Sequence, residues 1–196
     1  MLKTILVTAI YLTGAFSSGF NSQGMPIASN SYWQQRVGEA SGRNMVIAKT
    51  IKRKDFAPAL NNLEDWKFRK FTRVKAWILR QKTTGIRLVY LPPLVDSKGI
   101  RYLAGIAELC RPKDGVALVW ANDTNQAGEN RVFTTQLIAA HEIGHAVGAW
   151  HDSTMYLNGA SIMHPYAAAP EFIRPDMEFS NRSKSEIRFC LTSQGM

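Results

Sequence analysis

Residues 141–152 read HEIGHAVGAWHD, near the end of an apolar region (132–149) that predicts a strong helix. Residues four apart share one face of a helix, so His141 and His145 can present two imidazole nitrogens to one metal ion. Glu142 lies one step further round the helix. It can reach a water molecule on that ion but cannot easily become a ligand itself.

A third metal ligand needs a turn in the chain, because a straight helix would carry His151 past the ion. Gly148 can adopt the left-handed conformation that ends a helix, and this would return His151 to the metal. Three protein ligands and one open position are typical of catalytic zinc, whereas structural zinc has a fourth Cys or His ligand. The chain contains only four histidines, and the remaining one is His164. The pattern therefore predicts one catalytic zinc ion.

The expected chemistry follows from these ligands. Three neutral imidazoles leave the charge of zinc largely intact, which lowers the pKa of a bound water to about 7. Glu142 would act as general base towards that water while zinc polarises the scissile carbonyl of a protein or peptide substrate. The alternative is a non-catalytic secreted binding protein on a peptidase scaffold. Such proteins often lack the base or a ligand, and neither is missing in this sequence.

The motif resembles the signature of the metzincin zinc peptidases, which continues with a methionine turn. Residues 161–166 (SIMHPY) fit that turn, which implies that Met163 lies beneath the zinc site and that His164 points elsewhere. Asp152, directly after the third histidine, resembles the adamalysin or reprolysin branch, which includes ADAM and snake-venom peptidases. The implied fold class is α/β (α+β): a zincin catalytic domain with a mixed, mostly parallel sheet, an active-site helix and an irregular C-terminal subdomain.

Two further segments are similar to this branch. LAGIA (103–107) resembles its substrate-side edge strand, which implies backbone pairing of the substrate with Ala104, Gly105, Ile106 and Ala107. FSNRS (179–183) resembles its Phe-Ser-x-Cys-Ser segment, but Arg182 stands where the family has Cys. A second disulfide at that place is therefore not expected.

The chain has two cysteines, Cys110 and Cys190. An even pair in an exported chain indicates one disulfide, and two buried free thiols are the alternative. The resemblance to reprolysins implies the disulfide, because a long-range bridge of this kind is widely shared in that branch.

The N-terminus has the order of a secretory signal peptide, with Lys3 before an uncharged apolar run and small residues at 17–19. A buried or amphipathic first helix is the alternative. We divide the chain into a signal peptide (1–19), a poorly structured lead-in (20–44) and the catalytic domain (45–196). The expected location is extracellular, and it agrees with possible N-glycosylation at Asn122 and Asn181.

Hydrophobic periodicity and turn residues predict the other elements. Strands are expected over 45–51, 86–91, 101–109 and 115–120, and helices over 58–81, 132–149 and 183–191.

The composition restricts the choice of partners. The chain has 196 residues and a net charge of +9, yet many basic residues belong to the solvated face of the helix expected over 58–81 and its approach. No nucleic-acid-binding motif occurs, and no segment after the N-terminal run is long and apolar enough to span a membrane. We expect a monomer with protein or peptide substrates, without nucleic-acid or membrane partners. Calcium binding is left unassigned, because no clustered carboxylate loop stands out.

Overall fold

The computed structural model describes the predicted metal ligands His141, His145 and His151 together with Glu142. The described residues are 3–12, 31–53, 75–76, 78–91, 105–120, 129–153, 155–156, 159–165 and 176–196.

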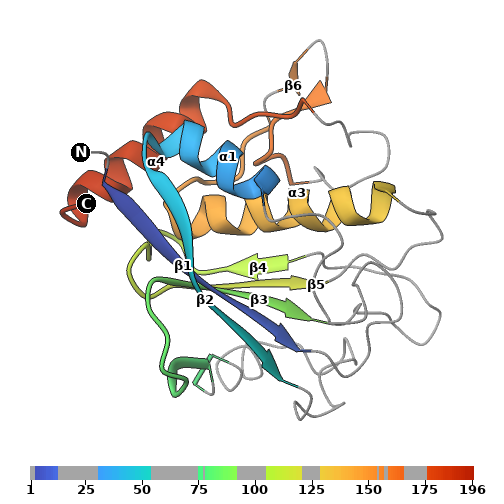
Figure 1. Ribbon diagram of the computed structural model, residues 1–196. Helices are drawn as coiled ribbons and strands as arrows, with labels where there is room; N and C mark the ends of the chain where they lie inside the picture. Colours follow the sequence, from blue (N-terminus) through green and yellow to red (C-terminus); the bar gives the residue numbers. More distant parts are fainter. Residues whose placement is uncertain are drawn as a thin grey trace.

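A five-stranded sheet forms the framework, with the strand order β2-β1-β3-β5-β4 (Figure 1). Four strands are parallel, and β4 pairs antiparallel with β5 at one edge of the sheet. Every residue of β3 and β5 is buried, as expected of apolar strands that are covered on both faces. The strands are β1 (Thr4–Leu12), β2 (Asn44–Arg53), β3 (Ile86–Leu91), β4 (Gly105–Ala107) and β5 (Val116–Trp120).

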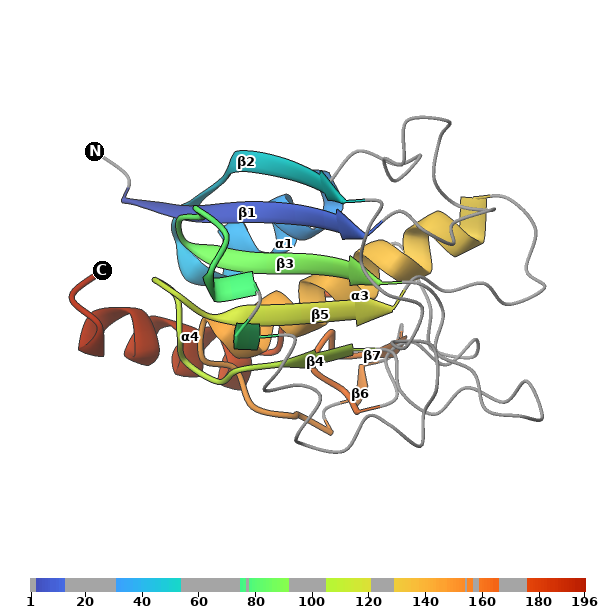
Figure 2. The same cartoon turned by 90° about the horizontal axis from the view of Figure 1, so that it is seen from below.

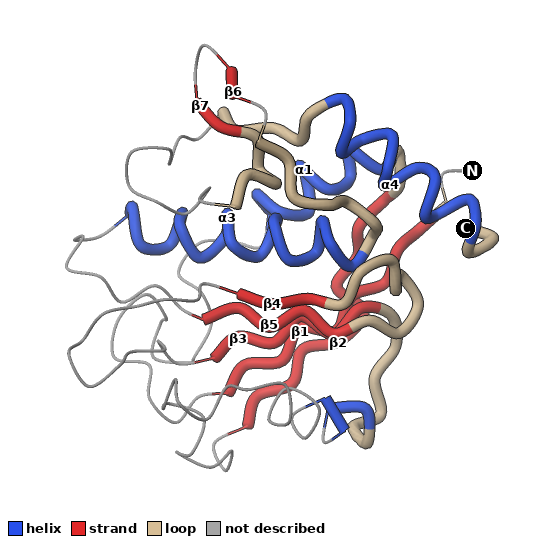
Figure 3. The backbone as a smooth tube through the Cα atoms, turned by 180° about the vertical axis from the view of Figure 1, so that it is seen from behind, coloured by secondary structure: helices blue, strands red, loops and turns tan. Residues whose placement is uncertain are grey.

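Three helices cover one face of this sheet, as the views from below and from behind show (Figures 2 and 3). They are α1 (Ser31–Ser41), α3 (Glu129–Ala146) and α4 (Asn181–Ser193). The largest described core cluster lies between these helices and the sheet. A short hairpin of β6 (Met155–Tyr156) and β7 (Gly159–Ala160) follows α3. The predicted fold class is confirmed by this mixed, mostly parallel sheet with its long helix.

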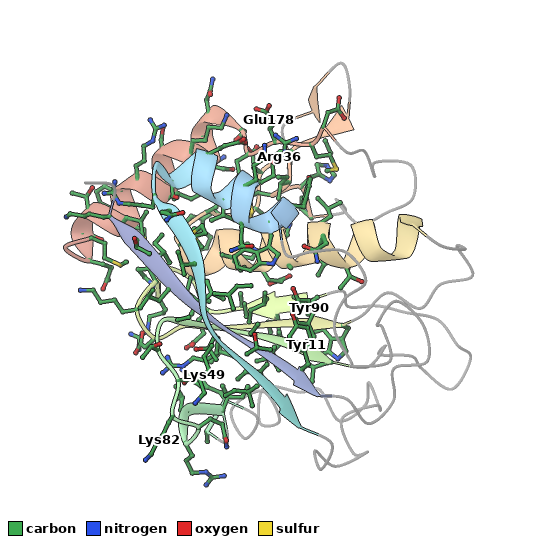
Figure 4. All side chains as sticks on the ribbon, in the orientation of Figure 1. Tyr11, Arg36, Lys49, Lys82, Tyr90 and Glu178 are labelled. Atoms are coloured by element: carbon green, nitrogen blue, oxygen red, sulfur yellow. A yellow bond between two sulfur atoms is a disulfide. The ribbon has the colours of Figure 1, made fainter. Side chains whose placement is uncertain are left out.

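β1 lies inside the sheet, hydrogen-bonded to β2 on one side and β3 on the other. Ile5 and Val7 are completely buried, and Tyr11 stacks on Tyr90 of β3 with ring centroids 4.8 Å apart (Figure 4). The removable leader over residues 1–19 stays a prediction, although residues 4–12 of that stretch form β1 in this structure. Its removal would take away the strand that joins β2 to the rest of the sheet. An apolar, β-branched run suits both a leader and a strand buried on two faces, so composition could not separate them.

Part of the predicted lead-in over residues 20–44 is helical, because α1 lies within it. Trp33, Val37 and Ala40 are fully buried at helical spacing and pack into the core. Arg36 of α1 reaches Glu178 just before α4, with 3.9 Å between charged atoms (Figure 4). The folded domain therefore begins well before residue 45.

The other predicted elements agree with the structure to different degrees. The strand over 86–91 is confirmed at both ends, and the helix expected over 132–149 runs three residues earlier at each end. The strand expected over 101–109 is observed at 105–107, and its first four residues lie outside the described part. Only the C-terminal end of the helix expected over 58–81 lies within the described residues, and 75–76 and 78–79 are helical there.

Among the described residues, the helices are too short or too polar to cross a bilayer.

The place of β1 in the core can be tested with neighbouring substitutions. Val7→Asp is expected to cost more than about 4 kcal/mol of folding stability, because it buries an unpaired charge at a fully buried position. Leu6→Asp is the matched control and should stay folded, since Leu6 is 40% exposed. Thermal unfolding followed by circular dichroism checks both variants. If both melted like wild type, β1 would not be part of the folded domain.

Candidate active site

The three predicted ligands come together at the C-terminal end of α3. The ring centroids of His141 and His145 are 4.8 Å apart, and His151 lies 5.3 Å and 4.8 Å from them. One ligand nitrogen from each ring lies within 4.8 Å of the other two. The arrangement can hold a single metal ion between the rings.

Hydrogen bonds fix the orientation of the two helical imidazoles. Nδ1 of His141 donates to the backbone carbonyl of Ile162 at 2.6 Å, and Nδ1 of His145 donates to that of Ala149 at 2.7 Å. A proton on Nδ1 leaves the lone pair on Nε2 free for a metal, which is the usual orientation of histidine ligands in zinc sites. This donor set fits zinc.

Both of these imidazoles are held neutral. Burial, followed by the nearby His145, lowers the pKa of His141 from 6.5 to about 3. Burial also lowers the pKa of His145, against the effect of its bond to the Ala149 carbonyl. Only the neutral ring can donate a lone pair to a metal, so the site is ready for a cation at neutral pH.

The turn that returns His151 to the site depends on Gly148. Its φ is +116°, and its N–H donates to the carbonyl of His145 at 2.9 Å. A Cβ at this position would overlap Cβ of Cys190 and lie 3.0 Å from its Sγ. Cys190 is joined to Cys110, as predicted, with Cα atoms 5.7 Å apart. The disulfide therefore packs directly against the turn.

Met163 packs against Gly144, which lies between the two helical histidines in the sequence. A Cβ on Gly144 would lie 2.6 Å from Sδ of Met163 and 2.7 Å from Cε1 of Phe179. The two side chains thus form an apolar floor below α3, and both are buried. His164 is not in the three-histidine group, and its N–H donates to the Ser161 carbonyl at 2.9 Å.

Asp152 connects the third ligand to two supporting elements. Its N–H donates to the Met163 carbonyl at 2.9 Å, and its carboxylate accepts from the hydroxyls of Ser180 and Ser183. Ser180 is the N-cap of α4 and accepts from the N–H of Ser183 at 3.0 Å. The family resemblance points to the segment 179–183 that contains these serines but not to their contact with Asp152.

The side chain of Glu142 lies against Gly105 of β4. This side chain is 5% exposed, and its buried Oε2 has no hydrogen-bond partner among the described residues. Burial raises the pKa of this carboxyl well above its usual value. A buried, unpaired carboxylate oxygen is costly to stability, and such groups are typical of functional sites. This oxygen is a suitable acceptor for a proton from water at the metal.

The remaining predicted site residues lie at the periphery. Gly105, Ile106 and Ala107 form β4, which pairs on one side only among the described residues, whereas Ala104 lies outside them. Asn181 is exposed at the start of α4, and Asn122 lies outside the described residues.

Fold and site together define a zinc-dependent peptidase of the metzincin type. Residues 27–152 match the reprolysin-like metallo-peptidases of family M12B, and the chain belongs to this family because the match covers more than half of it. The metzincin resemblance inferred from the sequence is thereby confirmed. No curated protein matched the sequence.

Solved structures show the same fold. The chain is similar to archaemetzincin from Methanopyrus kandleri, with a TM-score of 0.60 and 14% identity over 96% of both chains. It also resembles metalloproteinase-II from Bacteroides fragilis, with a TM-score of 0.55 and 14% identity, covering 96% of this chain and 53% of the other. At such low identity these matches establish the fold, and the family match indicates protein or peptide substrates.

The shifted pKa values predict how acid affects the metal-free protein. Above about pH 6.5 His141 and His145 are mostly neutral in both folded and unfolded chains. As the pH falls from there towards 3, His141 is protonated only after unfolding, so stability is lost. Glu142 opposes this loss, because its raised pKa lets the folded state bind the carboxyl proton first.

Glu142→Gln removes that opposing effect. Its melting temperature, measured with a zinc chelator, should fall more steeply than that of wild type between about pH 7 and pH 5. Equal slopes would contradict the assigned pKa shift of Glu142.

Proposed function

We propose that this protein is a reprolysin-like endopeptidase that cleaves extracellular proteins. The observation that carries the proposal is the buried Glu142 carboxylate, with its unpaired oxygen, one residue from a converging set of three histidines. A site that only bound metal for stability would not need a buried base beside it, because an unpaired carboxylate lowers stability.

Each side chain has a role in hydrolysis. Zinc held by His141, His145 and His151 would supply a positive charge that activates water and polarises the scissile carbonyl. Glu142 accepts a proton from the attacking water and gives it to the departing amine nitrogen. Its raised pKa favours holding the proton between these two transfers. The carbonyls of Ile162 and Ala149 keep two of the imidazoles in place during the reaction.

The edge of β4 that has no partner strand among the described residues supports endopeptidase activity. An extended peptide can pair with an exposed strand through backbone hydrogen bonds. Such a peptide would continue past the reacting bond in both directions, so the enzyme would cut within a chain. Because this pairing uses backbone groups, substrates with different sequences could bind in the same way.

The extracellular location is part of this proposal, and the disulfide between Cys110 and Cys190 supports it. Disulfides persist in oxidising compartments and are rare in the cytosol. The disulfide supports this location whether or not residues 1–19 are a leader.

The state of the cysteines can be measured directly. Protein from its native source is treated with a thiol-blocking reagent and analysed by mass spectrometry before and after reduction. We expect no label on Cys110 or Cys190 before reduction and two labels afterwards. Free, labelled thiols in the native protein would contradict the extracellular location.

Activity can be tested with a peptide library and zinc-loaded protein. Glu142→Ala should lower kcat/KM by about 10²–10⁴-fold, because proton transfer by a positioned base contributes that much. Glu39→Ala, at an exposed position on α1, is the matched control and should cleave like wild type. A chelator should abolish cleavage, and added zinc should restore it. Cleavage that persisted in Glu142→Ala or in chelator would refute the mechanism, and an inactive zinc-loaded wild type would favour a binding protein.

A further inference from the structure

Gly105 of β4 lies directly against the carboxylate of Glu142. A Cβ built on Gly105 would lie 2.5 Å from Cγ and 2.6 Å from Cδ of Glu142, and closer still to Oε1. Carbon atoms in van der Waals contact are about 3.5–4.0 Å apart, so even a methyl group would displace the carboxylate. The edge strand and the base can adopt these positions together only when residue 105 has no side chain.

Close packing against Gly105 restrains this carboxylate. Oε2 of Glu142 has no hydrogen-bond partner among the described residues, and the side chain is 5% exposed. The side chain leaves α3 and meets the bare Cα of Gly105 on the strand beside it. The position of the base therefore depends on how closely β4 approaches α3.

The backbone of Gly105 also faces the open edge of the sheet. Glu108 donates its N–H to the carbonyl of Val116 at 3.1 Å, and hydrogen-bonded pairs alternate with unbonded ones in an antiparallel ladder. Gly105 is three residues away and lies opposite Val119, so it falls in an unbonded pair. Its N–H and C=O then point away from β5. They face the opposite side of β4, where an added strand would lie.

We propose that Gly105 is a positioning residue, which sets the distance between the Glu142 base and a substrate held on the edge of β4. The inference rests on the proposed peptidase function and adds a specific requirement for glycine. Gly105 packs against Glu142 and would also donate and accept backbone hydrogen bonds with the substrate. The position of Gly105 would thus affect both the placement of the base and the placement of the substrate.

The kinetic test is Gly105→Ala in the zinc-loaded protein. We expect kcat to fall about 10²-fold with KM changed less than about threefold, because a catalytic group misplaced by about 1 Å has an effect of this size. Glu142→Asp shortens the base by one carbon, about 1.5 Å, and makes room for the added methyl group. The double variant should therefore be no slower than Gly105→Ala alone. If the two losses multiply in the double variant, Gly105 does not position the base.

A stability test needs no activity. Gly105→Ala should lower the melting temperature by roughly 5 °C in wild type, because it overpacks a buried contact. In the Glu142→Ala background the collision is absent, and the loss should shrink to roughly 1 °C. Equal losses in both backgrounds would show that the contact does not exist and would overturn the proposal.

Gly38→Ala in α1 is the matched control for this cycle. Its Cβ would meet only the Arg43 carbonyl at 3.2 Å and one Met45 carbon at 3.9 Å, far from the base in sequence. The same change in melting temperature is therefore expected with and without Glu142. An inactive wild type would refute the proposed function, whereas the temperature cycle separately decides whether Gly105 and Glu142 are in contact.

Discussion

Three imidazole nitrogens must meet at one point in this site, yet one face of a helix can supply only two of them. α3 supplies His141 and His145, and the third ligand reaches the same point only because the chain reverses at Gly148. That reversal needs both a φ of +116° and a missing Cβ, since Cys190 fills the space beside the glycine. The disulfide and α4 therefore support the metal centre, although neither carries a ligand.

The base depends on a different support. Consecutive helix residues point about 100° apart, so His141 faces the segment that contains Met163 while Glu142 faces the edge strand β4. The metal-binding face and the base are therefore held by two separate parts of the fold, one after α3 in the chain and one before it. A change in β4 should act on the base and on the substrate while leaving the histidines in place.

The sequence predicted those parts of the site whose geometry is local. The histidine spacing, the turn at Gly148 and the strand over 86–91 depend on residues that are close in the chain, so periodicity and turn chemistry were enough. β1 was missed because burial on both faces gives a strand the same uniform apolar composition as a leader peptide. The contacts of Gly105 and Gly144 could not be predicted either, since a glycine in the sequence does not show which distant side chain fills the space beside it.

Arg182 shows how a departure from the family pattern is compensated. The resemblance places a cysteine there, and with arginine in its place no disulfide can form at the start of α4. Nε of Arg182 instead pairs with Oε1 of Glu186 at 3.0 Å, and Oε2 of Glu186 accepts the N–H of Trp150 at 2.9 Å. Exposed ion pairs contribute about 0–1 kcal/mol, so this pair alone stabilises little. Its consequence is positional: it orients the carboxylate that holds the backbone directly before His151, and α4 is thereby tied to the third ligand a second time.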